Sequence, residues 1–200
     1  LVEANESSVP VLGINTDVSV SSRGRFTLTE LDQKALMRPL TKWNAVLDRS
    51  ADIPRTFRAA FNAMTTGRPG AAHIALPFDV QNGPVDKKEV WGDPSLGSYP
   101  SRRVAPDPFH IELAAKLLRT AKRPVFICGG GPVISGAQGE LLELAERLSA
   151  PVATTISGQG SISEDHPLAV GVVGSNGGTV ETRSIVDQAD LVVFVGCRAG

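Results

Sequence analysis

The second half of the chain alternates between short apolar runs and longer segments with one apolar face. The apolar runs have the length and β-branched content of buried strands, and they cover residues 124–128, 151–155 and 191–195. The segments between and before them carry apolar positions at helical spacing, and they cover residues 111–118, 141–148 and 179–189. Strands that alternate with helices of about a dozen residues predict an α/β fold with a parallel, doubly wound (Rossmann-like) sheet.

The first 83 residues show a weaker form of the same pattern. Apolar runs at 9–14 and 71–76 predict strands, and a helical stripe predicts a helix over 52–66 that ends at Gly67. A short helix is expected over 30–37, before Pro39, and a polar loop over 15–28. Two strands are too few to close an independent core, so residues 1–83 are interpreted as the tail of a second α/β domain.

Residues 84–106 have no periodicity and are rich in proline and glycine, which is typical of a linker. We expect Trp91 and Tyr99 to hold this linker against a neighbouring domain and keep it ordered. Asp107 followed by Pro108 is the pattern of a helix start, so a second domain is predicted over 107–200. Its last predicted strand ends five residues before the end of the sequence, which suggests a fragment of a larger protein.

Composition narrows the function classes. A formal net charge of −1 gives no basic surface for nucleic acid. No apolar run reaches membrane-spanning length, and no signal pattern opens the chain. Cys128 and Cys197 are isolated, as expected for reduced thiols in a cytoplasmic protein. His73, His110 and His166 are too far apart in sequence for a metal-ligand spacing, so no metal site is predicted.

The strongest local motif is the predicted strand 124–128 followed directly by Gly129, Gly130 and Gly131. Glycines at the carboxyl end of a parallel strand let backbone N–H groups approach a phosphate. The spacing departs from Gly-x-Gly-x-x-Gly, so the usual nicotinamide-nucleotide fingerprint is absent. Two interpretations stay open on this motif alone: a phosphate site, and a tight strand-to-helix turn without a ligand.

A series of further motifs follows along nearly the whole chain. The motifs are Val9–Gly13, Glu30–Gln33, Pro39–Trp43, Gly67–Gly70, Leu76–Gln81, Asp165–Pro167, Gly171–Gly174 and Ala189–Arg198. In this order they resemble the thiamine-diphosphate-dependent enzymes of the acetolactate synthase and benzaldehyde lyase group. The resemblance implies the end of a pyrimidine-binding domain in residues 1–83, a linker in 84–106 and much of a central domain in 107–200.

The resemblance also implies a cofactor site, because flavin-containing members hold FAD in the central domain. The matching positions are Arg68, Gly130, Gly131, Thr155, Ile156, Ser157, Ser175, Asn176, Gly177, Gly196 and Arg198. Two arginine forks and glycine N–H groups suit phosphate or ribose. The alternatives are that Arg68 pairs with a carboxylate, that the glycines form turns, and that this domain binds another nucleotide or nothing.

Three departures from the family pattern concern the substrate. Thr29 stands where family acetolactate synthases have Gln, Ser19 where they have Pro, and Phe78 where they have a substrate-channel Lys. A less charged or larger substrate than that of acetolactate synthase is therefore expected, as in aldehyde lyases or 2-oxoacid decarboxylases. Lys42 is a second candidate channel residue; the alternative is an exposed lysine that binds backbone carbonyls.

By this resemblance the parent protein uses thiamine diphosphate and Mg²⁺, and the cofactor supplies the chemistry. The catalytic Glu and the metal motif are expected outside this chain, and Glu30 and Asp32 are not assigned to those roles. We therefore expect a piece of a homo-oligomeric carboligase or decarboxylase that is inactive alone. The rival hypothesis is a nucleotide-binding module without thiamine chemistry, which explains residues 107–200 but leaves the motifs at 67–81 unexplained.

Overall fold

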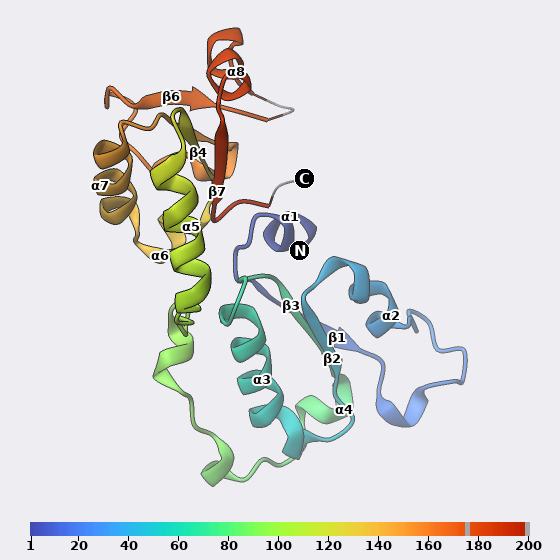
Figure 1. Ribbon diagram of the computed structural model, residues 1–200. Helices are drawn as coiled ribbons and strands as arrows, with labels where there is room; N and C mark the ends of the chain where they lie inside the picture. Colours follow the sequence, from blue (N-terminus) through green and yellow to red (C-terminus); the bar gives the residue numbers. More distant parts are fainter. Residues whose placement is uncertain (175–176, 199–200) are drawn as a thin grey trace. The chain divides into compact units, whose positions relative to one another are not determined.

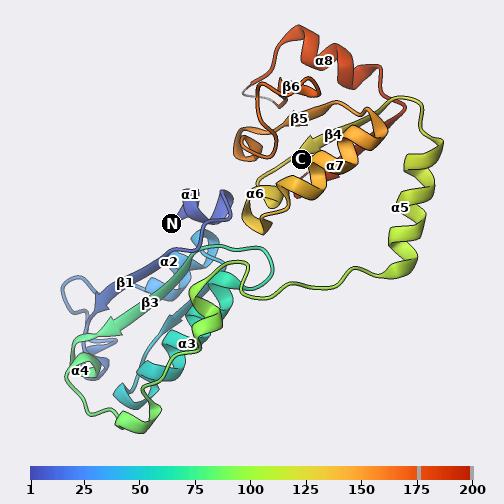
Figure 2. The same ribbon diagram turned by 90° about the vertical axis from the view of Figure 1, so that its left-hand side faces the viewer.

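The computed structural model describes residues 1–174 and 177–198, and the chain divides into two compact units. The first unit is Leu1–Arg103 and the second is Val104–Gly200. The boundary lies near the predicted start of the second domain. Figures 1 and 2 show a separate sheet with its own helices in each unit.

The first unit is built on a parallel three-stranded sheet with the order β1-β3-β2. The strands are β1 (Leu12–Asp17), β2 (Trp43–Val46) and β3 (Ala72–Pro77). The prediction of only two strands was wrong, because it lacked β2, which pairs with β3. Strand β1 also lies three residues later than predicted, so the expected loop over 15–28 begins too early.

Helix α3 (Ile53–Thr65) covers one face of this sheet. Its buried Ala60 and Met64 pack against Ile74 of β3, as the helical stripe predicts. Asp52 does not cap the helix with its side chain and instead pairs with Arg49 and Arg55. The other helices up to residue 81 are short: α1 (Val2–Glu6), η1 (Val20–Ser22), α2 (Gln33–Met37), η2 (Arg38–Leu40), η3 (Ser50–Asp52) and α4 (Phe78–Gln81).

The segment after α4 packs on the first unit. It contains η4 (Lys87–Glu89) and η5 (Pro94–Gly97), and η5 contacts α3. The buried side chain of Leu96 belongs to this segment. The guanidinium carbon of Arg58 in α3 lies 4.1 Å from the centroid of the Trp91 ring. Trp91 therefore contacts a helix of the first unit, and Figure 2 lets the reader follow the green chain beside α3.

The second unit is built on a parallel four-stranded sheet with the order β6-β5-β4-β7. Its strands are β4 (Pro124–Cys128), β5 (Val152–Thr154), β6 (Ala169–Val172) and β7 (Leu191–Val195). Strands β4 and β7 match the predicted boundaries and lie side by side, with Phe126 in register with Val193. Strand β6 was not predicted. The parallel α/β fold class is confirmed.

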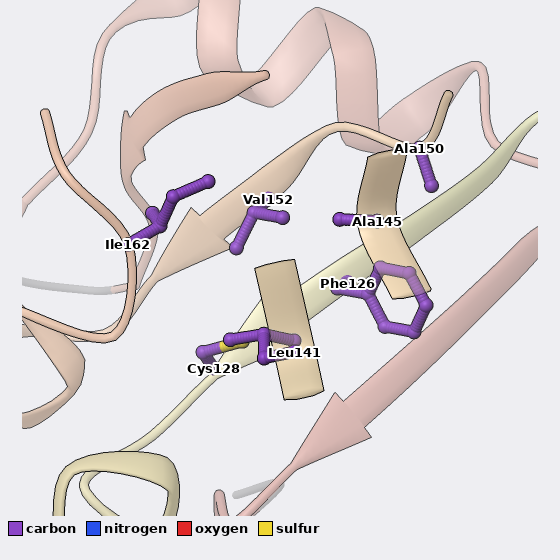
Figure 3. Close-up of a cluster of buried hydrophobic side chains, with 7 residues drawn as sticks. All are labelled: Phe126, Cys128, Leu141, Ala145, Ala150, Val152 and Ile162. Atoms are coloured by element: carbon purple, nitrogen blue, oxygen red, sulfur yellow. The ribbon is translucent and has the colours of Figure 1, made fainter. Parts of the chain in front are cut away.

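One face of this sheet forms the core shown in Figure 3. Phe126 and Cys128 alternate along β4 and pack against Leu141 and Ala145 of helix α7 (Gln138–Leu148). The residues between them on β4, which point to the opposite face, are buried as well. Both faces of the sheet are therefore covered.

Two helices of the second unit begin at a side chain that caps them. Asp107 accepts a hydrogen bond from Phe109 N at the start of α5 (Pro108–Thr120), as predicted. Thr179 accepts one from Thr182 N at the start of α8 (Val180–Asp187). Such caps satisfy N–H groups that the first turn leaves without partners. The short helices α6 (Gly131–Ser135) and η6 (Ile156–Gly158) follow β4 and β5 directly.

Candidate functional site

The candidate site of the second unit lies at the carboxyl edge of its sheet, where parallel strands place ligands. Gly130 and Gly131 follow β4, Ser157 follows β5, and Gly196 follows β7. A Cβ placed on Gly130 would lie 3.1 Å from Ser157 O, and one on Gly131 would lie 2.4 Å from Gly196 Cα. The fold thus brings these four predicted residues together.

The glycines of this edge are packed against one another's backbones. A Cβ on Gly129 would lie 2.3 Å from Gly196 O, and one on Gly158 would lie 1.9 Å from Cys128 O. Distances below 3.0 Å exclude any side chain at these positions. Close contact between loops is therefore sufficient to explain why glycine stands there.

Hydrogen bonding distinguishes the three consecutive glycines after β4. Gly129 N–H donates to Val195 O at 3.0 Å, and Gly131 N–H donates to Gly196 O at 3.1 Å. Among the described residues, no backbone or side-chain acceptor pairs with Gly130 N–H. A pyrophosphate at this turn would meet the Gly130 amide directly, whereas the Gly131 amide would first have to leave Gly196.

The other predicted positions of this unit lie around the same edge or outside the described residues. Thr155 N–H donates to Cys128 O at 2.8 Å, which ties the end of β5 to β4. Ile156 exposes about half of its side chain. Gly177 approaches Val172 of β6. Arg198 lies two residues after Gly196. Ser175 and Asn176 fall outside the residues that the structure describes.

Arg68 belongs to the first unit and has protein partners there. Its Nε donates to Ser8 Oγ at 2.9 Å, and its Nη2 donates to Asn5 O and Glu6 O. The guanidinium thereby ties the end of helix α1 to the turn after α3. The fork predicted for a phosphate is engaged with backbone carbonyls.

The candidate channel residues also lie in the first unit. Lys42 Nζ donates to Thr66 O at 2.6 Å and to Arg68 O at 2.7 Å, which matches the alternative of a lysine bound to carbonyls. Burial lowers the pKa of Lys42, and the nearby charge of Arg68 lowers it further. Phe78 begins α4 at the carboxyl end of β3 and exposes 66% of its surface.

Two cavities contain residues that the sequence did not single out. One, of about 390 Å³, lies at the carboxyl ends of β1 and β2 and includes Asp17, Arg23 and Asp48. Arg23 bridges the two carboxylates, and the Asp17 side chain is only 6% exposed. The other, of about 260 Å³, lies beside β5 and includes Gln159 and Glu164. The first cavity is also lined by the Glu30–Gln33 motif, which the sequence pointed to without indicating a cavity, whereas Asp17, Arg23 and Asp48 carried no sequence signal.

Within residues 1–174 and 177–198, no cluster of three or more His, Cys, Asp and Glu side chains is arranged to hold a metal ion. No helix in the described part of the chain is both long and apolar enough to cross a bilayer.

A parallel sheet with glycines at the ends of its strands defines an α/β protein of the Rossmann-like class. Residues 111–200 match the family described as "Thiamine pyrophosphate enzyme, central domain". This match lies within the second unit, and the chain as a whole is similar to acetolactate synthases, enzymes of the thiamine-diphosphate-dependent group. The resemblance predicted from the motifs is confirmed.

Individual relatives match over both units. The chain is 42% identical over 200 residues to a probable acetolactate synthase large subunit of Methanocaldococcus jannaschii, covering 99% of this chain and 34% of the relative. It is 32% identical over 199 residues to a glyoxylate carboligase of Escherichia coli, covering 99% and 33%. The chain thus spans about a third of the length of these relatives.

Solved structures share the fold. Benzoylformate decarboxylase from Polynucleobacter necessarius superposes with a TM-score of 0.79 at 24% identity, covering 96% of this chain and 35% of that one. At this identity the likeness supports the fold and not the reaction.

Proposed function

We propose that the chain is part of a thiamine-diphosphate-dependent carboligase or decarboxylase that acts on 2-oxo acids or aldehydes. One observation carries the proposal: the 42% identity to a probable acetolactate synthase large subunit extends over 99% of the chain and hence over both units. A nucleotide-binding module without thiamine chemistry is not favoured, because it requires no similarity in the first unit.

The proposal assigns a role to each segment. Residues 1–83 form the end of a pyrimidine-binding domain, 84–106 the linker, and 107–200 much of the central domain. Thiamine diphosphate supplies an electron sink for breaking and making bonds beside a carbonyl. The family pattern places the residues that hold Mg²⁺ and the diphosphate in parts of the parent protein other than this chain.

We further propose that the central unit binds the phosphates of FAD or ADP at the turn after β4. The available Gly130 N–H supports this site, and the loop that carries Ser157 lies beside Gly130. Of the three glycines after β4, Gly130 is the one whose amide has no acceptor among the described residues, because Gly129 and Gly131 donate to Val195 O and Gly196 O. The site is tested by titrating the chain with ADP while the NMR resonance of the Gly130 amide is monitored. An unchanged resonance at saturating ADP would refute it.

The substrate proposal rests on Phe78. An exposed aromatic ring at the carboxyl end of β3 replaces the lysine of the family pattern, so a larger or less charged substrate than pyruvate is favoured. The parent is proposed to be a cytoplasmic homo-oligomer, because the family places active sites between subunits and both cysteines are unpaired thiols.

The full-length parent protein, supplied with thiamine diphosphate and Mg²⁺, provides the test. Carbon dioxide release and carboligation products are measured with pyruvate, glyoxylate and benzoylformate. We expect turnover that disappears when thiamine diphosphate is omitted. Turnover that continues without it, or no turnover with any 2-oxo acid or aldehyde, would overturn the proposal. Residues 1–200 alone are expected to be inactive under the same conditions.

A further inference from the structure

An apolar cavity of about 660 Å³ lies within the first unit, between helix α3 and the segment 85–97. Its size falls in the range of small-molecule sites, roughly 300–1,000 Å³. The cavity lies against the side of α3 rather than at the carboxyl ends of the strands, and no residue of the candidate sites above lines it. The residues that matter for its chemistry are Phe57, Arg58, Phe61, Trp91, Asp93 and Leu96.

Aromatic side chains form two walls of this cavity. Phe57 and Phe61 are four residues apart on α3 and therefore lie on the same face of the helix. Trp91 belongs to the segment that crosses this face, and 58% of its surface is exposed. Phe61 is 41% exposed. Aromatic rings attract a flat ring between them beyond the gain from buried area.

Arg58 places a positive charge at the rim. Its Nη1 donates to Glu89 O at 2.7 Å and to Trp91 O at 3.4 Å, and its guanidinium stacks on the Trp91 ring. Only 19% of the Arg58 side chain is exposed. A guanidinium held in this way is a rigid fork on one side of an apolar cavity.

The second terminal nitrogen of Arg58 is loosely paired. Arg58 Nη2 lies 3.7 Å from Glu89 Oε2, beyond hydrogen-bond distance, and the Glu89 side chain is 61% exposed. Exposed ion pairs of this kind contribute little. Asp93, the acidic residue of the lining, accepts hydrogen bonds from Ser95 N and Ser95 Oγ. A carboxylate from solution can therefore displace Glu89 from Nη2.

We propose that this cavity binds an aromatic monocarboxylate, with the ring between Phe57, Phe61 and Trp91 and the carboxylate on Arg58 Nη2. The aromatic walls select the flat ring, and the single loosely paired guanidinium selects one negative charge. The site is separate from the proposed thiamine chemistry and does not depend on it.

Calorimetric titration of the 200-residue chain with 3-phenylpropanoate tests the proposal. We expect three analogues to bind at least tenfold more weakly. They are 3-phenylpropan-1-ol, which lacks the negative charge, 3-phenylpropylamine, whose charge is positive, and octanoate, which lacks the ring. Equal binding of the alcohol or of octanoate would overturn the assignment. No binding of 3-phenylpropanoate at millimolar concentration would also overturn it.

Variants separate Arg58 from a general effect on folding. Arg58→Gln is expected to weaken 3-phenylpropanoate about tenfold and to leave the alcohol unchanged. Glu89→Gln is expected to strengthen 3-phenylpropanoate about threefold, because the competing carboxylate is gone, and misfolding cannot produce a gain. Arg55→Gln is the matched control: Arg55 lies on the same helix, pairs with Asp52 and does not line the cavity. Loss of binding in Arg55→Gln, or no gain in Glu89→Gln, would contradict the proposal.

Discussion

Asp190 binds the backbone N–H groups of Lys122 and Arg123, with its Oδ2 2.7 Å from Lys122 N and its Oδ1 2.8 Å from Arg123 N. Asp190 immediately precedes β7, and the two donors immediately precede β4. One carboxylate thus aligns the starts of two adjacent parallel strands. Hydrogen bonds from Lys122 and then Arg123 lower the pKa of Asp190.

We expect Asp190→Asn to lower the thermal midpoint of the second unit by a few degrees at pH 7. A carboxyl group whose pKa is lowered by folding stabilises the folded state above its unfolded pKa, about 3.9. That contribution disappears as the pH falls through the lowered value. The difference between wild type and variant should therefore shrink at pH 3. Circular dichroism melts measure it, and the exposed Asp187→Asn is the control. An equal effect of both substitutions would refute the role of Asp190.

Gly158→Ala is expected to destabilise the second unit by about 3 kcal/mol, which is typical of severe overpacking. Its Cβ would lie 1.9 Å from Cys128 O, and backbone cannot move aside as a flexible side chain can. Gly139→Ala is the matched control, because Gly139 lies in α7 with open space around it. That change should stabilise by about 0.5–1 kcal/mol. Urea denaturation of both variants checks the prediction. It would be contradicted if Gly158→Ala lowered the free energy of unfolding by no more than an ordinary surface substitution does.

His73 makes the first unit sensitive to mild acid. Its side chain is fully buried, and neither ring nitrogen has a hydrogen-bond partner among the described residues. Burial lowers the pKa of His73, so the unfolded chain binds a proton more readily than the folded one. Stability should then rise with pH and be lost as the pH falls below about 6.5.

The test compares wild type with His73→Leu by urea denaturation between pH 5 and pH 7.5. The wild type should lose more stability than the variant across this window. His110→Gln, at an exposed histidine of the second unit, controls for a general histidine effect. Identical pH profiles for wild type and His73→Leu would show that His73 does not titrate on unfolding.

The sequence predicted the strands that carry a strong local signal and missed those that depend on their neighbours. Strands β4 and β7 are continuous apolar runs, so both were located to the residue. Strand β2 contains Asn44 and only four residues, and its pairing with β3 stabilises it. Strand β6 contains Gly171 at φ +90° and pairs with β5 through a register shift. Neither β2 nor β6 has a periodic pattern from which a strand could be predicted.

The candidate site shows a related limit. A glycine required by a ligand and a glycine required by a neighbouring backbone look the same in a sequence. Gly158 contacts Cys128 O, and Gly131 contacts Gly196, although these partners are 30 and 65 positions away. Only the folded chain reveals that these positions are already occupied by backbone. The clustering of the loops followed from the parallel topology, whereas the pairing of the Gly129 and Gly131 amides and the open Gly130 amide did not.

Phe78→Lys in the full-length parent tests the substrate proposal. Restoring the cation of the family pattern should raise kcat/KM for pyruvate relative to benzoylformate by roughly tenfold, in the range that one changed pocket contact provides. Because Phe78 is exposed, the substitution should leave the melting temperature unchanged. Phe26→Lys, at a fully exposed ring, is the control. An unchanged substrate ratio in Phe78→Lys would remove Phe78 from the substrate channel.

The two cysteines should differ sharply in reactivity. Burial, and to a lesser degree the neighbouring Cys197, raises the pKa of Cys128 to about 11. At pH 8 the thiolate fraction of Cys128 is then on the order of one in a thousand, and its sulfur is also shielded within the core beside Leu141. Cys197 lies after β7 and is partly exposed. Iodoacetamide at pH 8 should therefore modify Cys197 in the folded chain and both thiols in urea, as peptide mass mapping will show. The Cys197→Ser variant should remain unmodified until it unfolds, and rapid labelling of that variant under native conditions would mean that Cys128 is not enclosed in the core.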